Sequence, residues 1–266
     1  MPDTPATPPV SAPPTAGASA SGGPASGLSS SSPSGAPADG EFSQRSFAPP
    51  PGALDLLLVR HGQSEAFTPG RPFALVNGQG NPALSPLGHE QGARVGARLA
   101  HEGIDAIYVT NLVRTAETAT ALAEGTGLTP MVEADLREVH LGEWEGGLFR
   151  QKVAEGDPIA LEMMARERWD VIPGGEPSDA LTTRVRAAIG RLASAHGGHR
   201  VVAFTHGGII SEVLRLATGA RPFAFTGAEN GSISQIVVVG DRWIVRRFND
   251  TAHLSAGFAT TSAPPT

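Results

Sequence analysis

The feature that most constrains the fold of this chain is an apolar run, residues 56–59, that ends directly in Arg60-His61-Gly62 and belongs to a strand expected over Leu54–Val59. A short apolar run bounded by a turn signal is typical of a strand buried on both faces, as in the parallel sheets of α/β proteins. In open α/β sheets, ligands bind just beyond the carboxyl ends of the strands. We therefore expect Arg60 and His61 to lie where a ligand is held.

The side chains at this strand end suit a phosphate group. Arg60 carries a planar fork of donors that matches phosphate oxygens. The imidazole of His61 is substantially neutral near pH 7, so it can act as a nucleophile. The pair indicates phosphoryl transfer through histidine.

A second apolar run, residues 201–204, ends in a similar way, in His206-Gly207-Gly208. A helix is expected to follow over Ile209–Ala217. Glycines at the start of a helix let backbone amides approach an anion, and the helix terminus adds the positive end of its dipole. This strand end is thus a second candidate for the same ligand site.

Arg114 is a third candidate, in the first turn of a helix expected over Leu112–Ala123. The helix follows a short strand expected over Asp105–Val109, and Thr110 or Asn111 is predicted to cap it. An arginine in the first turn is repelled by the positive end of the helix dipole. An anion in the same space would remove that conflict.

The fourth candidate is an acidic loop, residues 136–146, which follows a strand expected over Pro130–Ala134 and carries Glu138, Glu143 and Glu145. A carboxyl group beside apolar side chains can have its pKa raised enough to donate a proton near neutral pH. Each of the four motifs taken alone also fits an ordinary role, as a solvated charge or a hydrogen-bonded turn residue. Their combination favours a phosphate site.

Taken together, the motifs resemble the histidine phosphatase superfamily, in its phosphoglycerate-mutase-like branch. The matching segments are Arg60-His61-Gly62, the helix residues 111–119, the acidic loop 136–146, Thr205-His206-Gly207-Gly208, Pro173–Glu176 and Phe248–Leu254. The resemblance covers about Leu54 to Ser255. It implies an α/β fold, namely a three-layer α/β/α sandwich with a mostly parallel mixed sheet and a small helical insertion.

The resemblance also implies a role for each site residue. His61 attacks phosphorus, and Glu138, rather than Glu143 or Glu145, protonates the leaving oxygen. The phosphate group is held by Arg60, Gly62, Ser64, Arg114, His206 and Gly207. No metal ion and no organic cofactor is expected, because such a clamp replaces the metal ions that other phosphoryl-transfer enzymes use.

One position departs from the family pattern. Ser64 fits the Thr or Ser that follows Arg-His-Gly, but Phe67 stands where the family usually has Asn. One polar contact to the phosphate is therefore expected to be missing or supplied from elsewhere. Asn77 and Gln79 are candidates to supply it.

Three functions fit these residues. The first is a phosphomonoesterase acting on a small phosphorylated metabolite. The second is a phosphoglycerate mutase, which would use the same phosphohistidine; the mutases carry Glu-Arg-His-Tyr-Gly in the acid loop, where this chain has Glu138-Val-His-Leu-Gly. The third is a non-catalytic module that binds phosphorylated ligands, for which Phe67 is the one supporting feature. The acid loop without that Arg and Tyr and the short insertion favour hydrolysis over isomerisation, and the intact set of catalytic residues disfavours the non-catalytic module.

The remaining elements follow from periodicity and cap signals. Ser85 and Pro86 are typical of a helix start. The helix that starts there is expected to end near Ala100. Further helices are expected at Leu148–Ala154, Pro158–Arg168 and Ser178–Ala195. A strand is expected at Arg200–Phe204, and a hairpin of Ser232–Val239 and Arg242–Phe248 that turns at Gly240-Asp241.

Composition divides the chain into three parts. Residues 1–52 are almost entirely Pro, Ala, Ser, Gly and Thr and are predicted to be disordered, because they hold too little apolar surface to offset the entropy of ordering. Residues 53–256 are predicted to form the histidine phosphatase domain, and residues 257–266 a flexible tail.

Charge and residue usage narrow the partners. The formal net charge of −6 disfavours nucleic-acid binding, and the absence of cysteine excludes disulfides and thiolate metal sites. No apolar run reaches the roughly 18 residues that a membrane span requires. We expect a cytoplasmic protein whose partner is a small phosphorylated substrate; the sequence leaves the oligomeric state open.

Overall fold

The apolar run at the start of the folded region forms the central strand that the sequence predicts. In the computed structural model, which describes residues 44–255, β1 (Leu54–Arg60) pairs in parallel with β6 (Arg200–Thr205) and antiparallel with β7 (Ile233–Val239). The described residues from Phe47 onward belong to one compact unit.

Within the described residues the main sheet has the order β5-β4-β6-β1-β7-β8. The outer strands are β4 (Ala106–Val109), β5 (Met131–Val132) and β8 (Arg242–Asp250). Strands β5, β4, β6 and β1 are parallel, and β7 runs antiparallel to both of its neighbours. The prediction of a mostly parallel mixed sheet is confirmed.

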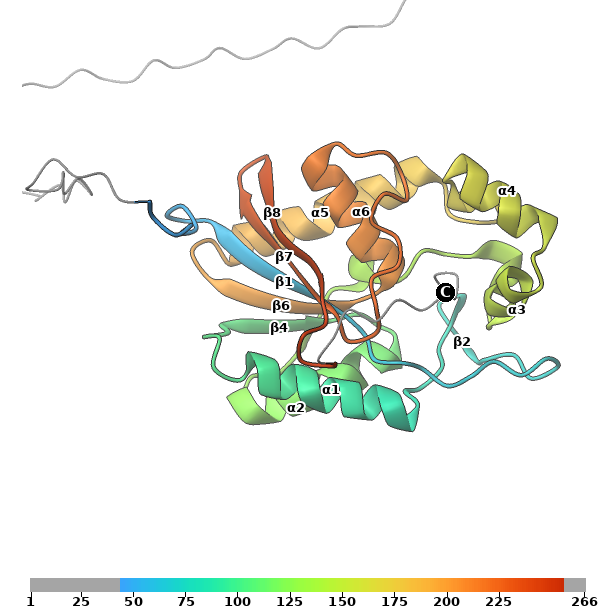
Figure 1. Cartoon of the computed structure of the whole chain (residues 1–266), viewed down its shortest axis with the longest axis horizontal. Helices are drawn as coiled ribbons and strands as arrows, with labels where there is room; N and C mark the ends of the chain where they lie inside the picture. Colours follow the sequence, from blue (N-terminus) through green and yellow to red (C-terminus); the bar gives the residue numbers. More distant parts are fainter. Residues whose placement is uncertain (1–43, 256–266) are drawn as a thin grey trace, which may run out of the picture. The chain divides into compact units, whose positions relative to one another are not determined.

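Helices cover both faces of the sheet, so the predicted three-layer arrangement is also confirmed (Figure 1). Leu56 and Leu58 of β1 pack with α5 and α6, whereas Leu57 and Val59 pack with α1 and α2. The alternation arises because successive side chains of a strand point to opposite faces. The helices are α1 (Pro86–Leu99), α2 (Val113–Thr126), α5 (Ser178–Ala195) and α6 (Gly207–Thr218).

The helical insertion forms beyond the carboxyl ends of the parallel strands, at the right of Figure 1. It contains α3 (Leu148–Ala154) and α4 (Pro158–Arg166), followed by a 3-10 turn at Trp169–Val171. Asp157 caps α4 by accepting a hydrogen bond from the Ile159 amide at 2.9 Å. A separate small core holds the insertion together; it contains Trp144, Phe149, Ala160, Met163 and Ile172.

Several predicted boundaries are wrong. The strand expected over Pro130–Ala134 is only the two residues of β5, and a 3-10 turn at Ala134–Leu136 follows it. Helix α6 begins at Gly207, two residues before the expected Ile209. Between β1 and α1, where no strand was predicted, the chain forms a short hairpin, β2 (Leu75–Val76) and β3 (Gln79–Gly80).

The cap of α2 is a further correction. The residue before the helix is Leu112, and neither Thr110 nor Asn111 caps it with a side chain. Instead, the side-chain oxygen of Asn81 accepts the hydrogen bond from the Val113 amide at 2.8 Å. A cap from a distant loop leaves no local sequence signal. It fixes that loop against the start of α2, next to Arg114.

The predicted tails lie largely beyond the described residues. Of the segment 1–52, the structure describes residues 44–52, which are exposed and contain no helix or strand. The predicted tail at 257–266 lies outside the described residues altogether. The predicted division of the chain at residues 52 and 256 stays a prediction.

Candidate active site

His61 lies at the carboxyl end of β1 with its ring buried. Its Nδ1 lies 2.7 Å from the carbonyl oxygen of Gly62. A carbonyl only accepts, so Nδ1 carries the proton and Nε2 keeps its lone pair. Burial, followed by the charges of Arg114 and Arg60, holds the pKa of His61 well below its ordinary value. The imidazole is therefore neutral, with the unprotonated nitrogen available as a nucleophile.

Arg114 links the two histidines. Its Nε donates to His61 Nε2 at 3.1 Å, and its Nη2 lies 3.3 Å from His206 Nδ1. The third nitrogen, Nη1, donates to the carbonyl oxygen of Gly80 at 3.0 Å. Burial lowers the pKa of Arg114 to about 10, which leaves the guanidinium charged at neutral pH.

His206 is fully buried at the residue that precedes α6. Because Arg114 can only donate to its Nδ1, the proton of the neutral ring is on Nε2, which lies 3.0 Å from the hydroxyl oxygen of Thr110. Burial and then the charge of Arg114 hold the pKa of His206 well below its ordinary value. The rings of His61 and His206 lie edge to face, with centroids 5.1 Å apart.

Arg60 completes the cationic side of the site. Its Nη1 donates to the carbonyl oxygen of Ala228 at 2.5 Å. A Cβ at Gly207 would lie 3.4 Å from Arg60 Nε, in ordinary van der Waals contact, so the guanidinium packs directly against this glycine. Burial lowers the pKa of Arg60, and the nearby carboxyl of Glu138 opposes that shift.

Glu138 lies on the same cavity wall as these residues. One carboxyl oxygen accepts from the Val139 amide at 3.0 Å and the other from the Gly208 amide at 3.4 Å. Burial raises the pKa of Glu138 above its ordinary value, against the opposing effect of these amides and of Arg114. A Cβ at Gly208 would lie only 2.6 Å from a Glu138 oxygen, so any larger residue than glycine here would displace the Glu138 carboxyl group.

The other two loop carboxylates do not take this position. Glu143 is exposed. Both oxygens of Glu145 are used by backbone amides, those of Gly80 and Leu141, each at 2.8 Å. The geometry thus agrees with the choice of Glu138 as the acid.

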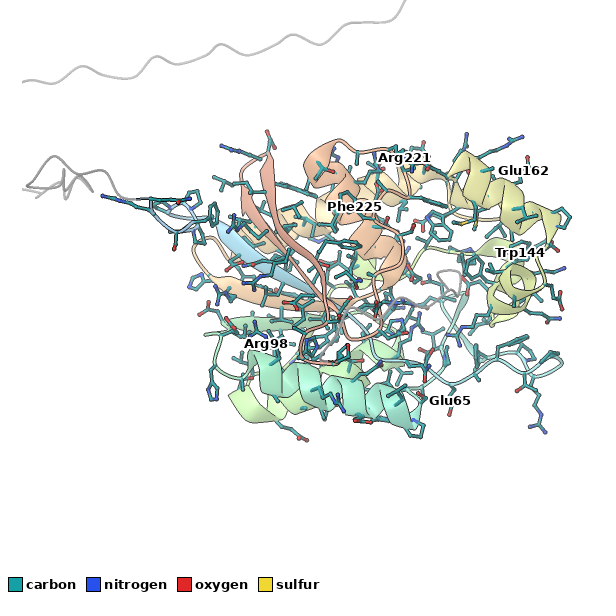
Figure 2. All side chains as sticks on the ribbon, in the orientation of Figure 1. Glu65, Arg98, Trp144, Glu162, Arg221 and Phe225 are labelled. Atoms are coloured by element: carbon teal, nitrogen blue, oxygen red, sulfur yellow. The ribbon has the colours of Figure 1, made fainter. Side chains whose placement is uncertain are left out.

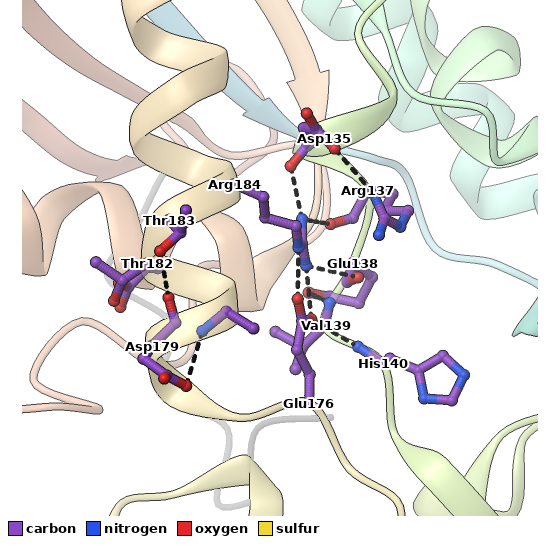
Figure 3. A network of polar contacts seen from close by, with 12 residues as sticks. Asp135, Arg137, Glu138, Val139, His140, Glu176, Asp179, Thr182, Thr183 and Arg184 are labelled. Carbon is purple, nitrogen blue, oxygen red and sulfur yellow. Dashed lines mark hydrogen bonds and ion pairs between the residues drawn. The ribbon is translucent and has the colours of Figure 1, made fainter. Parts of the chain in front are cut away.

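A buried ion pair braces the loop that carries Glu138 (Figure 3). The side chains of Arg184 and Glu176 are only 10% and 11% exposed, and Arg184 Nε lies 2.6 Å from a Glu176 oxygen. Arg184 also donates to the carbonyl oxygens of Asp135, Arg137 and Glu138. Glu176 lies in the segment Pro173–Glu176 that matches the family pattern, whereas no sequence signal pointed to Arg184.

Two of the three remaining residues predicted to bind phosphate line a cavity, and the third does not. Gly207 lies on the cavity wall beside Arg60 and His61. Ser64 lines an adjoining cavity that also reaches Arg60 and His61. Gly62 is not among the residues that line either cavity. Its backbone amide donates to the Thr118 hydroxyl at 2.9 Å. Its Cβ would press on the Gly88 backbone, so Gly62 serves close packing.

Phe67 does not supply the missing polar contact. Its ring packs against Phe73, with centroids 6.0 Å apart, and against the backbone of Gly147. Arg150, on α3, lines both cavities and donates to the Ser64 hydroxyl at 2.7 Å. This third arginine of the site was missed, because it comes from an insertion that none of the four motifs includes.

Of the two candidates for that contact, only Gln79 reaches the cavity. It is 2% exposed, and its Nε2 donates to the Glu138 carbonyl at 2.6 Å. Its carboxamide oxygen is buried without a hydrogen-bond partner among the described residues. Asn77 lies at the turn of the β2–β3 hairpin, with a φ of 49°.

Residues 44–255 contain no group of three or more His, Cys, Asp or Glu side chains that could hold a metal ion. The same residues contain no helix long and apolar enough to cross a membrane.

Comparison with known proteins places the chain in a family. The model of the histidine phosphatase superfamily, branch 1, matches residues 56–251. Phosphoglycerate mutase-like protein 4 of Arabidopsis thaliana is 34% identical over 207 residues, which is 75% of this chain and 86% of that protein. The metal-independent phosphoserine phosphatase of the same plant is 30% identical over 207 residues, 76% of this chain and 84% of that protein.

A solved structure shows the same arrangement. The mycobacterial glucosyl-3-phosphoglycerate phosphatase superposes with a TM-score of 0.63 at 28% identity, over 75% of this chain and all of that chain. The extent of the family match and the similarity to these relatives agree with the fold and the motifs. The chain therefore belongs to branch 1 of the histidine phosphatase superfamily and is an enzyme of that phosphatase class.

Proposed function

We propose that this chain is a metal-independent phosphomonoesterase that transfers the phosphoryl group of its substrate to His61 and then to water. The observation that carries the proposal is the state of His61. Its ring is neutral, its Nδ1 proton is held by the Gly62 carbonyl, and its Nε2 lone pair accepts a hydrogen bond from Arg114 Nε, which a phosphate oxygen of the substrate takes over when phosphorus approaches. A nucleophilic histidine needs this tautomer and this protonation state.

The first step forms a bond from His61 Nε2 to phosphorus and breaks the bond to the leaving oxygen. Arg60 and Arg114 stabilise the negative charge on the equatorial oxygens of the phosphoryl group during the transfer. Glu138 gives its proton to the leaving oxygen. The raised pKa of Glu138 favours the protonated form that this step requires.

The second step returns the enzyme to its starting state. Glu138, now a carboxylate, accepts a proton from the attacking water as the new oxygen–phosphorus bond forms. The bond between His61 and phosphorus breaks, and inorganic phosphate leaves. Both protons are accounted for, since Glu138 ends protonated and the His61 ring ends neutral.

The substrate is a small phosphorylated molecule. The relatives named above include a phosphoserine phosphatase and a glucosyl-3-phosphoglycerate phosphatase, both of which act on such molecules. The similarity to a phosphoglycerate mutase-like protein makes isomerisation the main competing activity. A cytoplasmic location stays a prediction from the sequence.

The proposal is tested with the full chain and para-nitrophenyl phosphate. Phosphate release should continue in EDTA and be inhibited by orthovanadate. His61→Asn should reduce turnover by a factor on the order of 10³ or more, because the covalent intermediate cannot form. His89→Asn, the same change at an exposed position of α1, is the control and should leave turnover unchanged.

Two outcomes contradict the proposal. One is near-normal turnover in His61→Asn. The other is conversion of 3-phosphoglycerate to its isomer faster than any phosphomonoester is hydrolysed, which would make the chain a mutase.

A further inference from the structure

The cavity that contains His61 extends well beyond the phosphate-binding side chains. Its volume is about 350 Å³, within the range of sites for small molecules. The part that lies away from His61 is built by the insertion and by the segment after α6. Its apolar wall consists of Phe73, Leu141, Trp144, Phe149, Val153, Leu161, Met163, Met164, Trp169 and Phe223.

The charged side chains that line the cavity are all engaged by other groups of the protein or lie at the phosphate end. Among the described residues they are Arg60, Arg114, Glu138, Glu145 and Arg150. The first three surround His61, and both oxygens of Glu145 hold backbone amides. The guanidinium of Arg150 donates to the Ser64 hydroxyl and the Glu65 carbonyl.

Uncharged polar groups are equally scarce there. Gln79 is tied through its Nε2 to the Glu138 carbonyl, so its uncharged carboxamide oxygen is held beside Glu138 at the phosphate end of the cavity, and the Thr226 hydroxyl donates to the Phe223 carbonyl at 2.9 Å. A carboxylate or ammonium group on the substrate would therefore be buried in the far part of this cavity without a charged partner. Such burial is strongly unfavourable.

Aromatic rings form a continuous series along the same wall. The ring centroids of Trp144 and Phe149 lie 6.3 Å apart, those of Phe149 and Trp169 lie 6.1 Å apart, and those of Trp169 and Phe223 lie 4.8 Å apart. These separations are typical of aromatic pairs in contact. Figure 2 shows Trp144 next to α3. A flat or chain-like apolar group has extended surface to cover here.

The rim of the cavity is apolar as well. Leu161 and Met164 of α4 line the cavity, yet their exposed fractions are 63% and 43%. Lying three residues apart, they project from the same side of the helix. Large apolar side chains left exposed beside a binding cavity are typical of a surface that a ligand covers.

We propose that the leaving group of the substrate is an apolar alcohol, so that the enzyme hydrolyses alkyl or aryl phosphate monoesters in preference to phosphorylated amino acids or carboxylic acids. This inference rests on the proposed phosphomonoesterase function. The phosphate lies among Arg60, Arg114 and His61, and the apolar part lies along the wall formed by α3 and α4.

A series of n-alkyl phosphates tests the inference, because the leaving groups have nearly the same acidity and differ in apolar surface. With the full chain, kcat/KM should rise by about fourfold for each added methylene from ethyl to hexyl phosphate. Phosphoserine and 3-phosphoglycerate should be hydrolysed more slowly than butyl phosphate.

Substitutions on the rim locate the effect. Leu161→Glu and Met164→Glu place a charge where the alkyl chain should lie, at exposed positions that the fold tolerates, and should flatten the dependence on chain length. Glu162→Gln is the control, since Glu162 lies on α4 outside the cavity wall (Figure 2). It should keep the wild-type dependence.

The outcomes separate this inference from the proposed function. Hydrolysis of ethyl phosphate and phosphoserine with no gain from longer chains overturns the inference and leaves the phosphatase function intact. A chain-length dependence that both rim variants retain also overturns it. Failure to hydrolyse any monoester, para-nitrophenyl phosphate included, overturns the proposed function itself.

Discussion

Replacing Arg184 by methionine should both destabilise the protein and impair catalysis. Arg184 lies in α5, away from the reacting atoms, and holds the loop that carries Glu138 (Figure 3). Its guanidinium makes a bidentate pair with Glu176, at 2.6 and 2.8 Å. It also donates to three carbonyl oxygens, at 2.6, 2.8 and 3.1 Å.

The size of the loss follows from burial. Glu176 is only 11% exposed, so Arg184→Met leaves a carboxylate buried without its cation. Removing one partner of a buried pair costs about 3–5 kcal/mol of the free energy of unfolding. For a domain of this size that corresponds to a fall in melting temperature of roughly 6–20 °C.

Arg191→Met is the matched control, because Arg191 lies in the same helix and also pairs with carboxylates. The side chain of Arg191 is 50% exposed, and its partners are Glu133 and Asp135. Exposed pairs contribute about 0–1 kcal/mol. The control should therefore shift the melting temperature by no more than a few degrees and leave kcat unchanged.

A second check is how the difference in free energy of unfolding between wild type and Arg184→Met depends on pH. Burial alone would raise the pKa of Glu176, but the hydrogen bonds and charge of Arg184 outweigh it and hold that pKa below its ordinary value of 4.5. A depressed carboxyl pKa stabilises the fold at neutral pH, and this stabilisation is lost as the pH falls below 4.5 through the folded-state pKa. The free energies of unfolding of wild type and Arg184→Met should therefore approach each other as the pH falls below 4.5. Equal, small losses in both arginine variants would refute the reasoning.

Three further predictions concern catalysis. Gly208→Ala should slow the hydrolysis of alkyl phosphates more than that of para-nitrophenyl phosphate, because the added Cβ displaces the acid Glu138 and alkyl leaving groups depend more on protonation. Gly125→Ala, whose added Cβ would have no atom within 4 Å, is the control and should change neither rate. On the acid side, kcat/KM should be kept until the pH is well below 6.5, because the pKa of His61 is lowered well below that ordinary value. On the alkaline side, kcat/KM should fall as Glu138, with its raised pKa, ionises, and Glu138→Gln should remove this alkaline limb. Arg150→Gln should weaken orthovanadate binding by about tenfold to a hundredfold, whereas exposed Arg166→Gln should not.

The sequence was sufficient where function follows from local pattern. An apolar strand that ends in Arg60-His61 must place both residues at the edge of the sheet, and the same holds for His206. The helix that begins at Val113 brings Arg114 to that edge. Glu138 could be chosen from its loop by resemblance, and its burial agrees with the choice.

The features that were missed depend on contacts between distant segments. Arg184 reaches the acid loop from 46 residues away along the chain, and Arg150 reaches Ser64 from 86 residues away. Asn81 caps α2 from another loop, so the expected local cap at Thr110 or Asn111 is absent. Hydrogen bonds of this kind leave no periodic signal, because only the folded backbone brings the partners together.

From the sequence, Met163, Met164 and Trp169 of the insertion fit either a core or the lining of a pocket, and the structure places all three in the cavity wall. The aromatic residues of the insertion, such as Phe149 and Trp169, satisfy the pattern of a small core whether or not they also line a site. Periodicity separates buried from exposed positions, and it does not separate a core from a cavity. The apolar character of the leaving-group side therefore became visible only in three dimensions.

The most direct test of the account is to trap the covalent intermediate. The full chain is mixed with a ³²P-labelled aryl phosphate, quenched in alkali within milliseconds and digested, and the labelled peptide is sequenced. The account predicts alkali-stable, acid-labile phosphate on His61, formed and lost at rates no slower than turnover, and absent from His61→Asn. Label on another residue, or turnover at the wild-type rate with no phosphohistidine at all, would contradict it.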